Sequence, residues 1–345
     1  MMTLSTSSLS TCLPALSAIN GRTRLVGVIG WPVSHSLSPR MHNAAFAALG
    51  LNWVYVPLPV APEQVEAAVR GLAALGFGGA NVTVPHKAAV APFMDELTPT
   101  AAAIGAVNTI VVRPDGTLFG DSTDGAGFMA DLGEHGQRIE ADRRMIPENP
   151  DVTVSPRHRV IVLGAGGAAR AVVYALAEAG ATVAVVNRTL GHAEELCHTI
   201  GRALPHARIS AHSFPVALPE LAAEADLIVN TTSLGLHEGD PLPWLPDLPF
   251  RGDQTIYDLI YSRPTPLLAL AERCGARALN GLGMLAHQGA RSFELWTGWE
   301  APIDVMLAVL RAASPPTPTA PSATAPTSPV TRARSSPTPM TSPIA

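Results

Sequence analysis

The sequence predicts an α/β protein of two domains, an N-terminal α/β domain with a mostly parallel sheet and a second domain of the Rossmann type. Three observations favour this fold class. Short apolar runs alternate with helical patterns in both halves of the chain, a Gly-rich turn at 164–169 joins a strand to a helix, and a polar stretch at 136–159 separates the halves. Of the 345 residues 47% are hydrophobic, which is enough for two cores.

In the first half, short apolar runs predict strands and longer stretches with apolar residues at helical spacing predict helices. Strands and helices alternate, as in a parallel sheet covered by helices. The predicted segments are a strand at 24–30, a helix at 38–50, a strand at 52–60, a helix at 61–76, a strand at 78–84 and a helix at 88–97.

The second half repeats this alternation. Residues 158–189 have the pattern of a strand, a Gly-rich turn, a helix and a second strand. Further strands are predicted at 225–232 and 254–261, with helices between them, and two final helices at 284–298 and 301–313.

The two ends differ from the rest of the chain. The first 20 residues lack periodicity, and the last 32 have no acidic residue and repeated X-Pro bonds, which is typical of disorder. We therefore expect a disordered extension at 1–21 and a disordered tail at 314–345. Between them, one domain covers 22–125 and is completed by helices at 284–312. Residues 126–283 hold a linker helix, the polar insertion and a Rossmann domain.

Composition narrows the class of partner. The net charge of −5 and the absence of a basic tract give no reason to expect nucleic acid, so a small molecule is the expected partner. No apolar run reaches the roughly 18 residues of a membrane span, so no membrane partner is expected. Cys12, Cys197 and Cys274 lack disulfide or metal-ligand spacing, so we expect no metal site and a reducing, cytoplasmic location. The oligomeric state is not encoded in these patterns, and a homodimer is kept as a hypothesis.

The Gly-rich turn predicts a dinucleotide site. It fits G-x-G-x-x-[G/A] after an apolar strand, where the first glycine permits the tight turn and the second lets the backbone approach a pyrophosphate at the helix N-terminus. A glycine turn alone is more often structural, but here strand, turn, helix and second strand all have the expected spacing. Its residues are Gly164, Ala165, Gly166, Gly167, Ala168 and Ala169.

The end of the second Rossmann strand favours NADP over NAD. An NAD site usually has an acidic residue there, whereas this chain has Asn187, Arg188 and Thr189. Arginine can bind a 2′-phosphate with its guanidinium group, and a neutral neighbour does not repel the phosphate.

Polar side chains follow several strands of the first half, in loops that parallel α/β sheets gather at one edge. Each has a structural explanation when taken alone, as a helix cap, a turn residue or a solvated charge. Lysine is scarce in this chain, which singles out the lysine in "NVTVPHK". The candidates are Ser36, Ser38, Thr83, Lys87, Asn108 and Asp124.

Nine motifs of the chain, four of which contain these candidate residues, resemble, in order, those of the shikimate dehydrogenases. The resemblance covers roughly residues 22 to 312, apart from the polar insertion. The motifs are GWPVSHSLSPRMHNAAF, NVTVPHK, IGAVNT, STDGAGF, GAGGAARA, NRT, NTTSLG, YDLIYSRPTPLL and GLGMLAHQGARSFELWTG.

The resemblance implies roles for matching positions. Lys87 and Asp124 correspond to the catalytic lysine and aspartate. For the substrate, the serines correspond to the carboxylate-binding pair and the other residues to those that hold or close over the ring: Ser36, Ser38, Thr83, Asn108, Asp124, Tyr261 and Gln288. The implied NADP-binding residues are Gly164, Ala165, Gly166, Gly167, Ala168, Asn187, Arg188, Thr189, His192, Leu259 and Gly281.

The implied activity is the reversible NADP-dependent reduction of 3-dehydroshikimate to shikimate in the shikimate pathway, which leads to chorismate and the aromatic amino acids. Hydride transfer at a secondary alcohol needs a titratable group at the oxygen, and Lys87 is the candidate. A free lysine, with a pKa of about 10.4, is mostly protonated at neutral pH and can donate a proton to the ketone.

Two alternatives stay open. The nearer is a quinate/shikimate dehydrogenase that uses NAD or both cofactors. His192 stands where NADP-using family members commonly have a second basic residue, and histidine is only partly charged at neutral pH. The other alternative is a nucleotide-binding module without catalysis, which predicts loss of the lysine and aspartate, yet Lys87 and Asp124 are both present.

Overall fold

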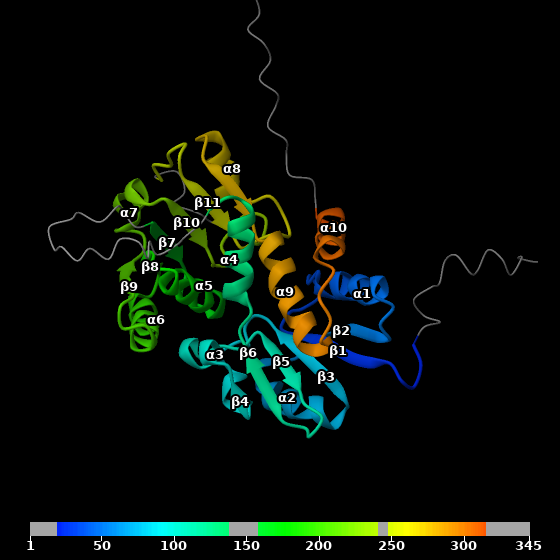
Figure 1. The fold of residues 1–345 in the computed structure, drawn as a ribbon. Coiled ribbons are helices and arrows are strands. Elements are labelled where there is room, and N and C mark those ends of the chain that lie inside the picture. Colours follow the sequence, from blue (N-terminus) through cyan, green and yellow to red (C-terminus); the bar gives the residue numbers. More distant parts are fainter. Residues whose placement is uncertain (1–18, 138–157, 241–247, 315–345) are drawn as a thin grey trace, which may run out of the picture. The chain divides into compact units, whose positions relative to one another are not determined.

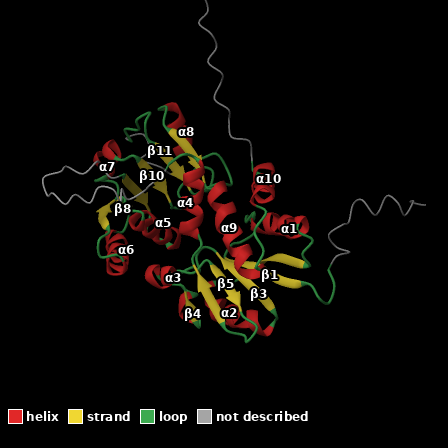
Figure 2. Ribbon diagram, in the orientation of Figure 1, coloured by secondary structure: helices red, strands yellow, loops and turns green. Residues whose placement is uncertain are grey.

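The structure, a computed structural model, describes residues 19–137, 158–240 and 248–314 (Figure 1). Nearly all of the N-terminal extension, most of the polar insertion and the Pro-rich tail lie outside the described residues. Strands and helices alternate along the described chain, as Figure 2 shows by colour, so the predicted α/β fold class is confirmed.

The strands of residues 19–137 form a six-stranded sheet in the order β2-β1-β3-β5-β6-β4. Strand β1 is parallel to β2 and β3, and β4 is parallel to β6, whereas β5 is antiparallel to β3 and β6. The elements are β1 (Arg24–Gly30), α1 (Ser38–Ala48), β2 (Trp53–Pro59), the 3₁₀ turn η1 (Pro62–Gln64), α2 (Val65–Ala74), β3 (Phe77–Val82), the 3₁₀ turn η2 (Ala91–Phe93), β4 (Glu96–Leu97), α3 (Pro99–Ile104), β5 (Thr109–Val112), β6 (Leu118–Asp121) and α4 (Asp124–Glu134).

The helix predicted at 88–97 is wrong. The segment contains only η2 and the short strand β4. Pro92 is the reason, because in the middle of a helix its ring would clash with the carbonyl of residue 88 and its missing N–H would leave that carbonyl unpaired. In η2 the same proline occupies the first turn, where no N–H is needed.

The strands of residues 158–280 form a second six-stranded sheet in the order β12-β11-β10-β7-β8-β9, in which every pairing is parallel. Val and Ile dominate β7 and β10, whose residues are almost all buried, as expected of central strands covered on both faces. The elements are β7 (Arg159–Leu163), α5 (Gly167–Glu178), β8 (Thr182–Asn187), α6 (Leu190–Ala203), β9 (Arg208–Ser213), α7 (Leu218–Glu224), β10 (Leu227–Asn230), β11 (Thr255–Asp258), α8 (Pro266–Arg273), β12 (Arg277–Asn280), α9 (Leu282–Thr297) and α10 (Ile303–Ala313).

The last two helices return to the first sheet. Phe293 and Trp296 of α9 join Phe46 of α1 and Tyr55 of β2 in one buried cluster, to which α10 also contributes. Helix α9 packs along α4 as well, so it lies beside the helix that follows β6. The described residues belong to one compact unit, and the domain boundaries expected from the sequence stay predictions. Within the described part of the chain, no helix is long and apolar enough to span a membrane.

Candidate active site

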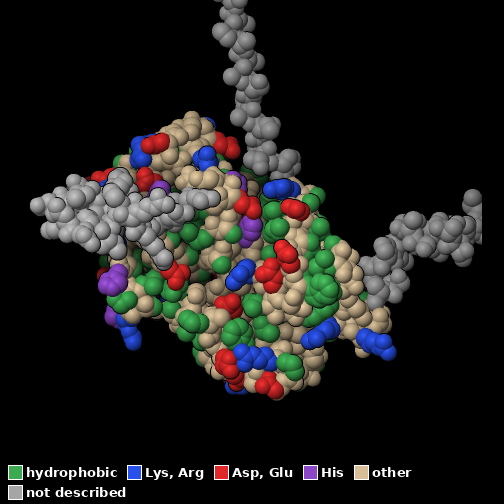
Figure 3. All heavy atoms as spheres, viewed as in Figure 1, with side chains coloured by type: hydrophobic (Ala, Val, Ile, Leu, Met, Phe, Trp, Pro, Cys, Tyr) green, Lys and Arg blue, Asp and Glu red, His purple; other side chains and the backbone are tan. Residues whose placement is uncertain are grey.

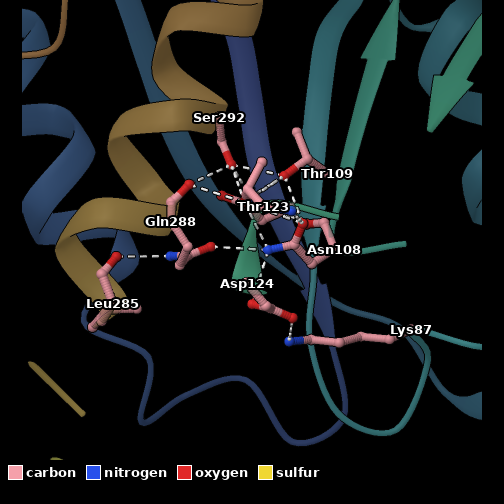
Figure 4. Close-up of polar contacts among 9 residues, drawn as sticks. Lys87, Asn108, Thr109, Thr123, Asp124, Leu285, Gln288 and Ser292 are labelled. Carbon is pink, nitrogen blue, oxygen red and sulfur yellow. Dashed lines mark hydrogen bonds and ion pairs between the residues drawn. The ribbon is translucent and has the colours of Figure 1, made fainter. Parts of the chain in front are cut away.

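Lys87 and Asp124 form the ion pair at the centre of the site (Figure 4). Lys87 lies in the turn after β3, and Asp124 is the first residue of α4. The Lys87 Nζ lies 2.5 Å from Asp124 Oδ2, and the two side chains are only 14% and 5% exposed. Lys87 is also the only lysine in the chain, since the other basic side chains of the Lys and Arg class are all arginines.

Asn108 fixes the other carboxylate oxygen of Asp124. Its Nδ2 donates to Asp124 Oδ1 at 2.9 Å and to Gln288 Oε1 at 3.1 Å. Its Oδ1 accepts the backbone N–H of Thr123 at 2.8 Å, which orients the amide. Residues from the turn after β3, the position just before β5, the start of α4 and the middle of α9 therefore meet in one buried polar network.

A further set of buried polar residues supports this network, and the sequence analysis did not identify it. Asn81 Nδ2 donates to the carbonyl of Asn108 at 3.1 Å and to Ser292 Oγ at 2.9 Å, while its Oδ1 accepts from Tyr55 Oη at 2.8 Å. Ser292 lies one turn after Gln288 on α9, a spacing that places both on one helix face. That spacing and the polar Asn81 within the apolar strand β3 were the only sequence signals available.

The serine pair lies at the start of α1, next to Tyr261. The backbone N–H of Ser38 donates to Ser36 Oγ at 3.3 Å. Burial raises the pKa of Tyr261, and the backbone N–H of Leu37 opposes that rise by hydrogen bonding to the phenol oxygen. The loop after β11 therefore contacts the loop before α1.

Tyr55 connects the serine pair to the central network. Burial raises the pKa of Tyr55, and a side-chain hydrogen bond with Ser38 opposes this rise. Because Tyr55 also donates to Asn81, a chain of side-chain contacts runs from Ser38 to the neighbours of Asp124.

Thr83 follows β3 and lies against Gly30 of β1. A Cβ placed on Gly30 would lie 2.4 Å from Thr83 Cγ2, so only glycine fits beside this threonine.

The Gly-rich turn has the properties of a pyrophosphate site. Gly164 follows β7 with φ of +108°, and a Cβ there would lie 2.7 Å from Thr231 Oγ1. Gly166 caps α5 without a side-chain hydrogen bond, and the first turn of α5 has no acidic residue, so its N–H groups can bind an anion. A Cβ on Gly167 would lie 3.0 Å from Lys87 Cβ, so the turn lies against the catalytic lysine candidate.

The segment after β8 is exposed and has no carboxylate. Asn187 ends β8, and its Nδ2 donates to the carbonyl of Thr189 at 2.9 Å. Arg188, Thr189 and His192 are exposed at the start of α6. Among the described residues, no ion pair occupies the Arg188 guanidinium, which leaves it available for a 2′-phosphate.

Leu259 and Gly281 come together at the ends of β11 and β12. A Cβ on Gly281 would lie 2.2 Å from the carbonyl oxygen of Leu259, so only glycine permits this approach. Next to them, Asp258 accepts from Asn230 Nδ2 and Thr265 Oγ1 at 3.0 and 2.7 Å, and burial raises its pKa to about 6. These contacts fix the loop that carries Leu259 and Tyr261.

The predicted residues therefore fall into three groups. Lys87, Asp124, Asn108 and Gln288 are in direct contact, Tyr261 contacts the backbone of Leu37 between the two serines, and the residues after β8 are exposed at the start of α6. On the face drawn in Figure 3, Lys and Arg side chains are interspersed with Asp and Glu and do not form a broad patch.

Family models of known proteins match three segments of the chain. Family models described as shikimate dehydrogenase substrate-binding domain, shikimate/quinate 5-dehydrogenase and shikimate 5′-dehydrogenase C-terminal domain match residues 28–110, 152–236 and 281–311. The shikimate dehydrogenase (NADP⁺) of Moorella thermoacetica is 46% identical over 300 residues, which are 86% of this chain and 95% of that protein.

Solved structures of a shikimate dehydrogenase and a quinate dehydrogenase are also similar to this chain. A crystal structure of a shikimate dehydrogenase in complex with NADP⁺ has a TM-score of 0.74 and 38% identity, over 85% of this chain and 96% of that one. The quinate dehydrogenase of Corynebacterium glutamicum in complex with NAD has a TM-score of 0.71 and 28% identity, over 84% and 99% of the two chains.

Proposed function

Because the chain belongs to the shikimate dehydrogenase family, we propose that it catalyses the reversible NADP-dependent reduction of 3-dehydroshikimate to shikimate, a step of the shikimate pathway. One observation carries the catalytic part of this proposal. The chain keeps a single lysine, and that lysine forms the buried ion pair with Asp124. Arginine can hold a charge but cannot give up its proton at neutral pH, whereas lysine can. The chain therefore has a lysine, not an arginine, where proton transfer is required.

In this proposal Lys87 donates the proton and Asp124 positions it. During reduction the ammonium of Lys87 protonates the ketone oxygen, and in the reverse direction the amine accepts the proton of the alcohol. Asp124 Oδ2 holds Lys87, while Oδ1, held by Asn108, can also accept from a neighbouring substrate hydroxyl. NADPH, when bound, supplies the hydride.

The substrate carboxylate and hydroxyls have separate partners. We assign the carboxylate to the hydroxyls of Ser36 and Ser38, at the N-terminus of α1, where the helix dipole favours an anion. Tyr261 covers the same end of the substrate. Thr83, Asn108 and Gln288 are assigned to the ring hydroxyls, because amide and hydroxyl groups can both donate and accept.

The NADP site follows from the second sheet. The turn from Gly164 to Ala168 binds the pyrophosphate, and Arg188, with Asn187, Thr189 and His192, binds the 2′-phosphate end. Leu259 and Gly281 lie on the side of the nicotinamide. This assignment is supported by the uncapped start of α5 and by the lack of a carboxylate after β8.

The remaining expectations stay predictions. We propose that 22–125 and 284–312 form the substrate-binding domain and that 126–283 forms the domain for NADP. A cytoplasmic location and a homodimer are likewise predictions.

The test measures the absorbance of reduced nicotinamide with purified full-length protein, shikimate or quinate, and NADP⁺ or NAD⁺. We expect strong turnover only for shikimate with NADP⁺. Comparable turnover with quinate or NAD⁺ would favour the alternative of a quinate/shikimate dehydrogenase. The observation behind this alternative is the similarity to the structure of a quinate dehydrogenase in complex with NAD. No turnover with any pair would overturn the proposed activity and favour a binding module.

A further inference from the structure

A cluster of potential metal ligands lies between α4 and α9, outside the groups assigned to catalysis. Asp131 and Glu134 are one turn apart on α4, and His287 lies on α9. One ligand atom from each residue lies within 4.8 Å of the other two. An imidazole with two carboxylates is a ligand set that zinc and related divalent ions accept.

The relative position of His287 and Glu134 suits two side chains that bind the same metal ion better than two that hydrogen-bond to each other. His287 Nε2 lies 3.2 Å from Glu134 Oε1. Nevertheless this nitrogen is buried and has no hydrogen-bond partner among the described residues, because the two groups are not aligned for a bond. In a tetrahedral site with bonds of 2.0–2.1 Å, ligand atoms are about 3.3 Å apart and point at the metal instead of at each other.

Asp131 is oriented as metal-binding carboxylates usually are. Its side chain is 3% exposed, and its Oδ2 accepts from the hydroxyl of Tyr257. Such a second hydrogen bond fixes the direction of a ligand. Its Oδ1 faces Gly283, where a Cβ would lie 1.7 Å away, so the absence of a side chain on α9 admits this oxygen between the helices. Burial raises the pKa of Asp131, a cost that a bound cation would offset.

We propose that Asp131, Glu134 and His287 form a binding site for a divalent transition-metal ion, with zinc as the ion to test first. The side chain of Glu134 is 53% exposed and gives the ion a route from solvent, while His287 is 15% exposed. The fourth position is left to water. The site is separate from the proposed hydride transfer and does not depend on it.

The metal would join the two helices that position the active-site residues. Helix α4 begins with Asp124, and Gln288 directly follows His287 on α9. A bound ion therefore stabilises the folded protein and the packing of α4 against α9, by linkage between binding and folding.

The test uses full-length protein freed of metal with a chelator. Zinc binding is followed by titration calorimetry and by the shift in Tm, and Co²⁺ serves as a spectroscopic probe. The informative variants are His287→Gln and Glu134→Gln, and the control is His198→Gln, which changes an exposed histidine on α6. Other histidines and the cysteines also bind metals, so the comparison between variants carries the result.

We expect one zinc ion per chain, a rise in Tm and a visible Co²⁺ spectrum of four-coordinate N/O ligation without thiolate charge-transfer bands. Either ligand variant should weaken the binding at least tenfold and remove the rise in Tm, while His198→Gln should behave as the wild type. Absence of saturable binding, or equal binding in wild type and both ligand variants, would overturn the proposal.

Discussion

Replacing His42 by leucine should make the protein more tolerant of mild acid. His42 is fully buried on α1, and neither ring nitrogen has a hydrogen-bond partner among the described residues. Its ring stacks on Tyr55 at a centroid distance of 4.4 Å, within a cluster that includes Phe46 and Trp296. No group in this apolar cluster can compensate a positive charge on the imidazole.

The size of the effect follows from the pKa. Burial lowers the pKa of His42 from 6.5 to about 3. Because the folded pKa lies below the unfolded one, the contribution to stability is present above pH 6.5 and is lost as the pH falls toward 3. The linkage relation gives a loss of about 2 kcal/mol at pH 5 and almost none at pH 7.5.

The assay is urea unfolding of wild type and His42→Leu at pH 7.5 and pH 5. Leucine has a similar volume and no titratable group, so the variant should differ little from wild type at pH 7.5. Between the two pH values the wild type should lose about 2 kcal/mol more than the variant, while His198→Leu, a change at an exposed site, should follow the wild type. Equal losses for wild type and His42→Leu would refute the reasoning.

Three further predictions concern packing, cofactor choice and pH. Gly127→Ala places a Cβ 2.5 Å from the backbone nitrogen of Gln288, so it should destabilise the protein by about 1–3 kcal/mol in thermal unfolding, whereas Gly133→Ala, with open space around it, should not. Arg188→Ala should raise the KM for NADP⁺ by about 10- to 100-fold and leave that for NAD⁺ nearly unchanged, since only NADP⁺ has the phosphate; equal effects would contradict the assignment. Burial raises the pKa of Asp258 to about 6, so its protonated carboxyl contributes about 2 kcal/mol of stability at pH 4.5 that is lost as the pH rises to 7. Relative to Asp258→Asn, the wild type should therefore lose about 2 kcal/mol more between pH 4.5 and pH 7, and urea unfolding of both proteins at both pH values measures this difference.

Local patterns predicted the elements with strong periodicity. The strand predicted at 24–30 coincides with β1, and the segment 158–189 contains β7, α5 and β8 in the expected order. The antiparallel strands β5 and β6 were not foreseen, because four-residue strands are too short to show periodicity. The helix predicted at 88–97 failed because a proline near its middle outweighs apolar spacing.

The candidate site could be predicted only in part. Motifs singled out Lys87 and Asp124, which the structure places in contact. The supporting contacts between Asn81, Tyr55 and Ser292 join residues more than 200 positions apart in one case, and no local pattern reports such a pairing. The approach of Gly167 to Lys87 is equally hidden, since it depends on how two segments pack.

The most direct test of the account is the kcat of Lys87→Ala for shikimate oxidation, together with the Kd of shikimate. The account predicts a fall in kcat of roughly 10²- to 10⁴-fold, the usual contribution of a positioned proton donor, and a Kd changed by only a few-fold. The variant Lys87→Ala contains no lysine, because Lys87 is the only one in the chain. Partial recovery of its turnover by an added alkylamine would therefore report the loss of the amine at this one position. A kcat close to that of the wild type would contradict the assignment of Lys87 as the group that transfers the proton.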